Sequence, residues 1–273
     1  MQRQFTPKAH PCVSAIPAFD DNYIWLIRKP GCDAVAVVDP GDPEPVEAVL
    51  REQGLRLAYI LLTHHHADHV GGVNRLREQY GSFVFGPAFE QIEGISQRCA
   101  DGDEIELPEL SLRLQVIEVP GHTSGHIAYF GQGLGDDVRP VLFCGDTLFA
   151  GGCGRVFEGT PGQMLESLDR LAALPGQTLV YCAHEYTRSN LRFAVAVEPG
   201  NARLQARLAE VDEQREIDEQ TVPSSIAIEL DTNPFLRCTE AEVVSTAASR
   251  LGTPPADPTA TFTAIREWKN VFR

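Results

Sequence analysis

The chain has 273 residues, enough for one large domain or for a core domain followed by a smaller one. Its formal net charge is -15, from 23 basic and 38 acidic residues, and no run of four Lys or Arg occurs. A chain this acidic repels a phosphate backbone, so nucleic acid is a poor candidate for the substrate. No stretch approaches about 18 consecutive apolar residues, so we expect no segment that spans a membrane.

Cysteine usage and the first residues indicate the compartment. The seven cysteines form an odd set without a CxxC pair, which favours reduced and mostly buried thiols. The segment Met1 to Val13 has no apolar core of the kind found in secretory signals. We therefore expect a cytoplasmic protein.

The first two thirds of the chain alternate between predicted strands and helices. Several strand candidates are short, continuous apolar runs, which suits strands that are covered on both faces. The predicted strands are Tyr23–Arg28, Ala34–Val38, Ala58–Leu62, Phe83–Phe85, Leu112–Val119, Ile127–Phe130, Val141–Cys144 and Thr178–Cys182. One predicted helix begins at Pro43 and ends at Gly54, and another runs from about His69 to Tyr80. A third follows Thr160-Pro161, where a capping residue precedes Pro at the first helical position.

After about Glu185 the predicted strands become scarce and the sequence pattern becomes helical. The charged stretch "NARLQARLAEVDEQREIDEQ" reads as an amphipathic helix, and Thr239–Leu251 and Thr259–Phe272 are further helical candidates. This pattern predicts a layered α/β domain followed by a small helical one.

The segment "LLTHHHADHVGG" holds the strongest chemical signal. Alternate side chains share one side of an extended segment, so His64 and His66 can face the same metal ion. Where the chain then turns toward a helix, Asp68 and His69 point elsewhere and can reach a second ion. Imidazole nitrogen and carboxylate oxygen are ligands for zinc and similar ions.

Further ligands are needed from other parts of the chain, and three candidates follow predicted strands. His122 lies in "VPGHTSGH", Asp146 in "VLFCGDTLF" and His184 in "LVYCAHEYT". Loops at strand ends are where α/β proteins place functional groups. Each candidate alone is weak evidence, but their combination and order favour a metal site.

The order HxHxDH, Gly-His, Gly-Asp-Thr and a late His resembles the metallo-β-lactamase superfamily. The segments "AFDDNYIWLI", "GDTLFAGGCGR", "HEYT", "VEPGN" and "NPFLR" are similar to glyoxalase II, the hydroxyacylglutathione hydrolases. The resemblance covers nearly the whole chain. It implies an α/β fold, a four-layer αββα sandwich over residues 1–184, followed by a helical glutathione-binding domain over residues 185–273.

The resemblance also implies a site with two divalent metal ions. It assigns His64, His66 and His122 to one ion, Asp68, His69 and His184 to the other, and a bridging role to Asp146. Zinc is the ion that we expect, although iron and manganese accept the same ligands. Two such ions lower the pKa of a shared water, so that thioester cleavage needs no Ser/His/Asp triad.

Three other histidines are outside this ligand set. Because His65 points away from its neighbours in an extended segment, we interpret it as structural. His126 is expected to orient a ligand through a hydrogen bond, and His10 has no evident role.

The implied reaction is hydrolysis of S-(2-hydroxyacyl)glutathione, typically S-D-lactoylglutathione, in methylglyoxal detoxification. For the glutathione part, the resemblance indicates Arg155, Tyr186, Arg266 and Lys269, of which the last two share one face of the final helix. The chain departs from the family at Phe157, where a Tyr is common and a hydroxyl is therefore lost. We expect a small-molecule substrate, no macromolecular partner and a monomer.

Two alternatives stay open on the sequence. A lactonase or β-lactamase would show the same metal ligands, but a small lactam has no need of the helical region. An iron-dependent persulfide dioxygenase also uses glutathione, but it typically holds one iron and lacks the extended helical part.

Overall fold

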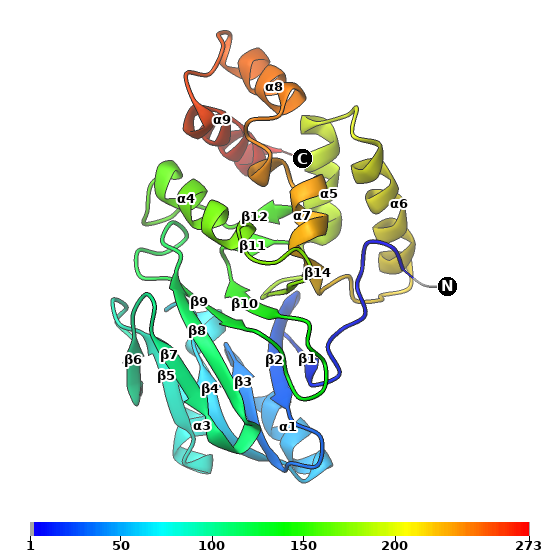
Figure 1. Cartoon of the computed structure of the whole chain (residues 1–273). Coiled ribbons are helices and arrows are strands. Elements are labelled where there is room, and N and C mark those ends of the chain that lie inside the picture. The colour runs from blue at the N-terminus through cyan, green and yellow to red at the C-terminus, as the bar shows by residue number, and fades with distance from the viewer. Residues whose placement is uncertain (1–2, 273) are drawn as a thin grey trace.

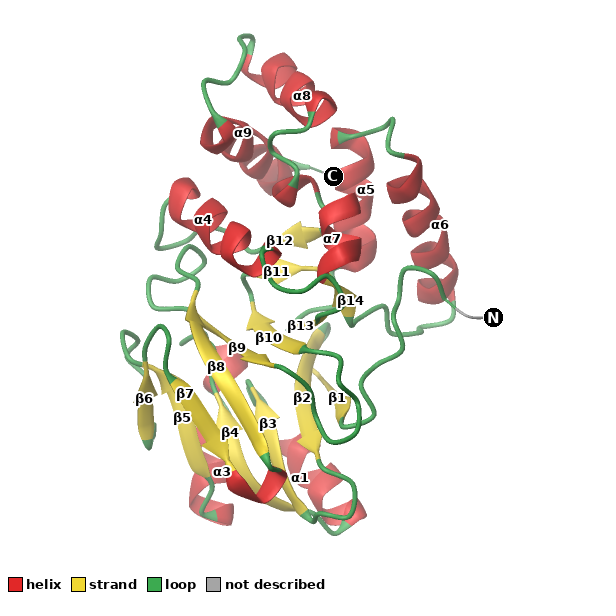
Figure 2. Cartoon of the chain, viewed as in Figure 1, coloured by secondary structure: helices red, strands yellow, loops and turns green. Residues whose placement is uncertain are grey.

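The computed structural model describes residues 3–272. Two six-stranded sheets lie face to face, and the helices of the last third of the chain gather at one end of them (Figure 1). Helices α1 and α3 lie on the outer side of the first sheet, opposite the second sheet (Figure 2). The chain therefore has the layered α/β architecture that the sequence predicts.

The first sheet has the strand order β1-β2-β3-β4-β5-β6. Its β1, β2 and β3 are antiparallel, and β3 to β6 are parallel. The strands are β1 (Val13–Ala18), β2 (Asn22–Arg28), β3 (Ala34–Val38), β4 (Arg56–Leu61), β5 (Phe83–Pro87) and β6 (Gln97–Cys99).

Alternation along these strands builds two hydrophobic layers. In β2, Trp25 and Ile27 face the second sheet, whereas Ile24 and Leu26 face α1 (Pro43–Gln53) and α3 (Val73–Tyr80). Successive side chains of a strand point to opposite faces, so a continuous apolar run is buried on both sides. This explains why "YIWLI" and "AVAVV" are apolar throughout.

The second sheet has the order β14-β13-β10-β9-β8-β7 and places the later ligand-bearing loops beside the first. All of its neighbouring strands are antiparallel except β10 and β13, which are parallel. The strands are β7 (Glu104–Leu107), β8 (Leu112–Glu118), β9 (Ile127–Gly131), β10 (Val141–Gly145), β13 (Leu179–Cys182) and β14 (Ser224–Ser225). A separate hairpin pairs β11 (Leu148–Phe149) with β12 (Gly152–Cys153).

Each predicted strand overlaps a strand of the structure, but the helix predicted from His69 to Tyr80 is two helices. Helix α2 (Ala67–Val70) ends at Gly71, and α3 begins after Gly72. The break is needed because Gly72 donates to the Pro40 carbonyl at 3.0 Å instead of continuing one helix. A Cβ at Gly72 would come within 2.5 Å of that carbonyl oxygen. Helix α1 matches its prediction, with Asp42 as its N-cap and Gly54 as its left-handed C-cap.

The last third of the chain is helical, as predicted, but its helices are not packed apart from the sheets. Phe193, Phe235 and Phe262 belong to the same buried cluster as Phe143 of β10 and Leu168 of α4. The helices of this region are α5 (Thr187–Val197), α6 (Ala202–Glu216), α7 (Ile226–Thr232), α8 (Ala241–Leu251) and α9 (Pro258–Val271), with the 3-10 turn η2 (Pro234–Leu236). Helix α4 (Pro161–Ala172) and the 3-10 turn η1 (Pro108–Leu110) come earlier in the chain. Among residues 3–272, no helix has the length and apolar character that crossing a membrane requires.

Candidate metal centre

Three histidines from two loops converge on one point. His66 Nδ1 lies 3.1 Å from His64 Nε2 and 3.0 Å from His122 Nε2. His64 and His66 follow β4, and His122 lies in the loop between β8 and β9. The far nitrogen of His122, Nδ1, lies 2.9 Å from the Arg155 carbonyl oxygen, which fixes the ring and leaves Nε2 facing its neighbours.

A second group lies beside the first and mixes nitrogen with oxygen. Asp68 Oδ2 is 3.5 Å from both His69 Nε2 and His184 Nε2. His184 comes directly after β13, in the second sheet, so the group joins both sheets. The Asn22 side-chain amide donates to Asp68 Oδ2 at 3.0 Å and holds the carboxylate in place.

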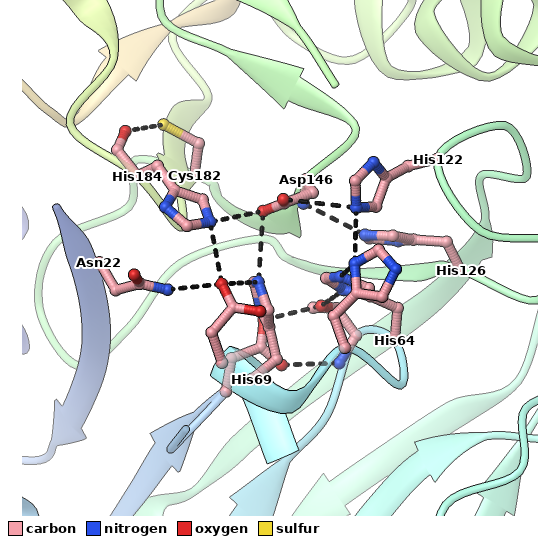
Figure 3. A network of polar contacts seen from close by, with 12 residues as sticks. Asn22, His64, His69, His122, His126, Asp146, Cys182 and His184 are labelled. Carbon is pink, nitrogen blue, oxygen red and sulfur yellow. Dashed lines mark hydrogen bonds and ion pairs between the residues drawn. The ribbon is translucent and has the colours of Figure 1, made fainter. Parts of the chain in front are cut away.

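Asp146 lies between the two groups, with one oxygen toward each (Figure 3). Its Oδ2 is 3.4 Å from His122 Nε2. Its Oδ1 is 3.5 Å from His69 Nε2 and 3.4 Å from His184 Nε2. The structure thus brings all seven predicted ligands into one cluster, in the two sets that the resemblance implies.

Two carboxylates orient ligand histidines from behind, and the sequence interpretation missed both. Asp39 Oδ2 lies 3.1 Å from His69 Nδ1, and Asp21 Oδ1 lies 2.7 Å from His184 Nδ1. A carboxylate that accepts from the outer ring nitrogen fixes the tautomer and turns the other nitrogen toward the centre. Asp39 directly follows the apolar strand β3, the same strand-end signal that marks Asp146.

Burial keeps the first set of histidines ready to act as ligands. It lowers the pKa of His64 and of His122, so both rings are neutral with a free lone pair at neutral pH. In the second set, burial is outweighed by Asp146 and the other carboxylates, which raise the pKa of His69 and of His184. At Asp146, burial is in turn outweighed by their positive charge, which lowers the pKa of its carboxyl well below its usual range, so a metal ion would displace protons from these two rings. Neutral imidazole and ionised carboxylate are the forms that bind divalent metals.

Two buried polar atoms of the cluster have no hydrogen-bond partner within residues 3–272, which is what a site for metal ions would show. His69 Nε2 and Asp146 Oδ1 are buried without a hydrogen-bond partner, although both face inward. Buried polar atoms almost always have a partner, so two orphans in one cluster require an explanation. A divalent ion held by these residues would supply it, because imidazole nitrogen and carboxylate oxygen suit zinc, iron and manganese alike.

The turn before Asp146 depends on glycine and on His126. Gly145 has φ +46°, and a Cβ there would lie 2.8 Å from His126 Nε2. That nitrogen accepts from the Asp146 amide at 3.1 Å, and the ring stacks on His64 with centroids 4.6 Å apart. His126 therefore contacts two of the predicted ligands from behind.

The other two histidines point elsewhere. His65 faces away from the cluster, with Nδ1 against Glu90 and Nε2 3.3 Å from Glu158 Oε1. His10 is buried, and its Nε2 lies 3.2 Å from the Asp137 carbonyl oxygen. Both are held in structural contacts.

A cavity of about 630 Å³ opens onto the cluster. His122 and Asp146 form its inner end, and residues of α5 and α9 form its outer walls. Its further lining is Phe149, Cys153, Arg155, Phe157, Tyr186, Ser189, Asn190, Arg266, Lys269, Asn270 and Phe272. All four residues that the resemblance indicates for glutathione therefore line one cavity with two of the candidate metal ligands, His122 and Asp146.

Arg266 and Lys269 differ in their surroundings although both line the cavity. Arg266 is 6% exposed, and its guanidinium donates to the Cys153 carbonyl at 3.0 Å and to Asn270 Oδ1 at 2.9 Å. Lys269 is only partly buried, and its ammonium donates to the Ser189 carbonyl at 3.1 Å. Burial, with Arg266 nearby, lowers the pKa of Lys269 to about 8. Arg266 is therefore a buried side chain packed against β12, although it also lines the cavity.

Two aromatic rings flank the inner end of the cavity. Tyr186 stacks on His184 with centroids 4.7 Å apart and planes 5° from parallel. Phe157 is 60% exposed and sets its ring against His66 and His122 at centroid distances of 5.8 and 5.3 Å. Phe157 therefore still covers the first ligand set, although it lacks the hydroxyl common in the family.

Solved structures of similar shape support the fold. ETHE1 from Myxococcus xanthus aligns with a TM-score of 0.62 and 26% identity, covering 96% of this chain and 99% of that chain. The BLEG-1 B3 metallo-beta-lactamase aligns at 0.60 with 22% identity, covering 82% and 99%. The structure of TTHA1623 in a di-iron-bound form aligns at 0.50 with 27% identity, covering 63% and 91%.

Curated relatives match almost the entire chain. The protein named hydroxyacylglutathione hydrolase from Pseudomonas aeruginosa (strain LESB58) is 53% identical to this chain, over 95% of this chain and 99% of the relative. The protein of the same name from Cupriavidus taiwanensis is 54% identical, over 96% of this chain and 99% of the relative. The model of the metallo-beta-lactamase superfamily matches residues 18–84 and 100–184, and that of the hydroxyacylglutathione hydrolase C-terminus matches residues 185–272. With its paired ligand groups and the cavity between sheets and helices, the chain belongs to the hydroxyacylglutathione hydrolases, the glyoxalase II family of the metallo-β-lactamase superfamily.

Proposed function

We propose that this chain hydrolyses S-(2-hydroxyacyl)glutathione, typically S-D-lactoylglutathione, to glutathione and a 2-hydroxy acid. This is the second step of methylglyoxal detoxification. The observation that carries the proposal is that one cavity is lined both by His122 and Asp146 of the candidate metal cluster and by the basic residues Arg155 and Lys269. A thioester carbonyl and a glutathione carboxylate lie at opposite ends of such a substrate.

We further propose that two divalent ions occupy the cluster. His64, His66 and His122 would hold one, Asp68, His69 and His184 the other, and Asp146 would contact both. Such ions lower the pKa of water toward 7 and polarise a carbonyl oxygen. Zinc is the ion that we expect, and the di-iron form of the TTHA1623 relative supports a binuclear site that also accepts iron.

The chain's own residues contribute positioning. Asp39 and Asp21 hold His69 and His184 with one nitrogen directed inward, so the ligand set is organised before substrate arrives. Phe157 and Tyr186 cover the inner end with apolar rings and limit access of water. The glutathione thiolate is a good leaving group, so its departure needs no strong general acid.

The positive groups of the cavity suit the carboxylates of glutathione. The chain as a whole carries -15, so Arg155 and Lys269 are an exception to its acidic character. Arg266 lies behind them and donates to β12, which makes it a wall of the site as much as a contact for substrate. We propose Arg155, Tyr186 and Lys269 as direct contacts and Arg266 as a support that reaches the same cavity.

The compartment and assembly follow from the same residues. All seven cysteines are free thiols, which favours a reducing compartment such as the cytoplasm. The candidate ligands and the cavity are complete within one chain, so the proposed site requires no residue from a second subunit. We therefore propose a monomeric enzyme of the cytoplasm.

The alternative functions make different demands on the helical region and on the metal cluster. A lactonase or β-lactamase needs the metal cluster but not the wall formed by α5 and α9. An iron-dependent persulfide dioxygenase consumes oxygen and uses one iron, whereas the cluster here has ligands on both sides of Asp146. The geometry therefore favours the thioesterase.

The deciding experiment follows lactoylglutathione cleavage by its ultraviolet absorbance, with metal content measured on the same sample. We expect turnover with two metal equivalents, and neither oxygen uptake nor cleavage of a lactam or lactone at a comparable kcat/KM. Absence of thioester cleavage by the metal-loaded protein would contradict the proposal.

A further inference from the structure

The β11–β12 hairpin forms one wall of the cavity and begins two residues after Asp146. It contributes Phe149 and Cys153 to the lining, and the chain then continues directly to Arg155. The hairpin forms a two-stranded sheet of its own, separate from both large sheets. Its position must therefore be set largely by contacts from elsewhere.

Those contacts come from the helical region. Asn233, the residue before η2, donates its side-chain amide to the Phe149 carbonyl at 3.3 Å and to the Gly152 carbonyl at 2.9 Å. Glu229 of α7 accepts the Gly151 amide at 2.8 Å. Figure 1 shows β11 and β12 beside α7, and Asn233 and Glu229 are themselves joined at 3.0 Å.

Asn233 and Glu229 are themselves fixed by a buried network of hydrogen bonds on the side away from the hairpin. Glu229 accepts from Arg207 at 2.7 Å and from Ser224, and Arg207 also donates to Thr232 at 2.6 Å. Arg207, Glu229 and Asn233 each have 0% relative exposure. A buried network of this kind fixes one geometry because each lost contact leaves a buried polar group without a partner.

The hairpin tip also fits closely against α5. Gly151 has φ +70°, and a Cβ there would lie 2.6 Å from Leu191 Cδ2. With the tip pressed on α5 and two of its carbonyls held by Asn233, little freedom is left to the strand that carries Cys153 and leads to Arg155.

We infer that Asn233 and Glu229 are positioning residues for the glutathione end of the reaction, acting through the β11–β12 hairpin. The inference rests on the proposed function, since it concerns how that substrate is gripped. Asp146 is held by β10 and by His126, which accepts from its amide; the link from the hairpin to the metal cluster is the Arg155 carbonyl, 2.9 Å from His122 Nδ1. Loosening the hairpin should therefore impair glutathione binding more than the metal centre.

The chain offers a matched control. Asn201 is also an N-cap asparagine, its side-chain amide donates to Glu198 at 3.0 Å and to the Asp231 carbonyl at 2.9 Å, and its oxygen accepts from Leu204. Asn233 has the same arrangement, since its oxygen accepts from the Phe235 amide. At either position, Asn→Asp keeps the oxygen that caps the helix but removes the amide donors. The new carboxylate lies beside Glu198 at position 201 and beside Glu229 at position 233. Only the residue at position 233 contacts the hairpin.

The experiment compares Asn233→Asp and Asn233→Ser with Asn201→Asp, all loaded with metal. We expect the Asn233 variants to raise KM for lactoylglutathione and the Kd of S-hexylglutathione, measured by calorimetry, by about tenfold, as loss of buried hydrogen bonds would. Because the Arg155 carbonyl also contacts His122, their metal content and their kcat/KM for a small thioester without glutathione should change, but by less than about twofold. Asn201→Asp should lower the melting temperature to a similar degree without changing KM.

Unchanged KM and Kd in folded Asn233 variants would overturn the inference. So would an equal rise in Asn201→Asp, because the effect would then be general loosening of the helical region. Asn233→Ser introduces no charge and serves if the aspartate variant does not fold. Failure of the wild type to cleave lactoylglutathione would contradict the proposed function instead, and calorimetry would still report on the hairpin.

Discussion

The Asp146 carboxylate is the residue whose two oxygens face different ligand groups. Asp146→Ala should therefore weaken both of the proposed metal sites at once and reduce turnover to background. Asp136→Ala, in an exposed loop, is the control and should change neither. Metal content by atomic emission and turnover of the same preparations check this. An Asp146→Ala enzyme with two ions and most of its activity would refute the assignment.

Neighbouring histidines should behave differently, because alternate side chains point to opposite sides. His66→Ala should lose metal from the first group, whereas His65→Ala should keep it, since His65 contacts Glu90 and Glu158 instead. Because His65→Ala leaves the buried Glu90 carboxylate short of a partner, we expect a loss of about 1.5–3 kcal/mol in the free energy of unfolding. Metal analysis and chemical denaturation separate the two effects. Equal metal loss in both variants would contradict the loop geometry.

The Lys269 ammonium should give substrate binding a pH dependence. Burial lowers its pKa to about 8, so the charged fraction falls as pH rises through that value. If Lys269 binds a glutathione carboxylate, KM should be low below pH 8 and rise above it. KM measured against pH, with Lys269→Met as the control, tests this prediction. The variant should have a raised KM throughout and should lose this part of the pH dependence, and an identical profile in both enzymes would count against the contact.

Among the elements, helix α9 carries two basic residues one turn apart, Arg266 and Lys269, and we expect them to have different roles. Arg266→Ala removes donors from the Cys153 carbonyl and from Asn270, so it should lower stability by about 1–3 kcal/mol as well as raise KM. Lys269→Ala should raise KM with little loss of stability, because its side chain is only partly buried. Melting temperatures and KM values for both variants distinguish the roles. An Arg266→Ala variant as stable as the wild type would mean that β12 does not depend on this contact.

Elements with strong local signals were predictable from the sequence, and those defined by distant contacts were not. The apolar strand β3 and the capped helix α1 carry their pattern within the segment itself. The edge strand β6 has three residues and β14 has two, so neither has a detectable period. The break at Gly72 arises from the approach of Pro40, a contact that no local pattern encodes.

The same distinction holds for the site. The metal-type residues stand out because four of them occur within six positions and the others follow strands. Asp21 and Asp39 escaped notice because a single carboxylate carries no signal until its histidine partner is placed beside it. Burial of Arg266 was missed because helical spacing predicts which residues share a face but does not say what covers that face.

For the whole molecule, one hydrophobic cluster runs through both parts of the chain. It includes Phe143 of the second sheet, Leu168 of α4, and Phe193 and Phe262 of the helical region. We therefore expect the metal-free protein to unfold in a single transition, with helical and tertiary signals melting together, even though two family models divide the chain. Calorimetry with far- and near-ultraviolet circular dichroism checks this, and two separate transitions would show independent domains.

The spread of the cluster along the chain has a consequence during synthesis. The candidate ligands run from His64 to His184, and the cavity is completed only by Phe272, just beyond α9. A growing polypeptide can thus present the first histidines to cellular metal long before Asp146 and His184 leave the ribosome, at about 5–20 residues per second. The thioester pocket closes last, so hydrolytic capacity arises only once translation has delivered nearly all of the protein.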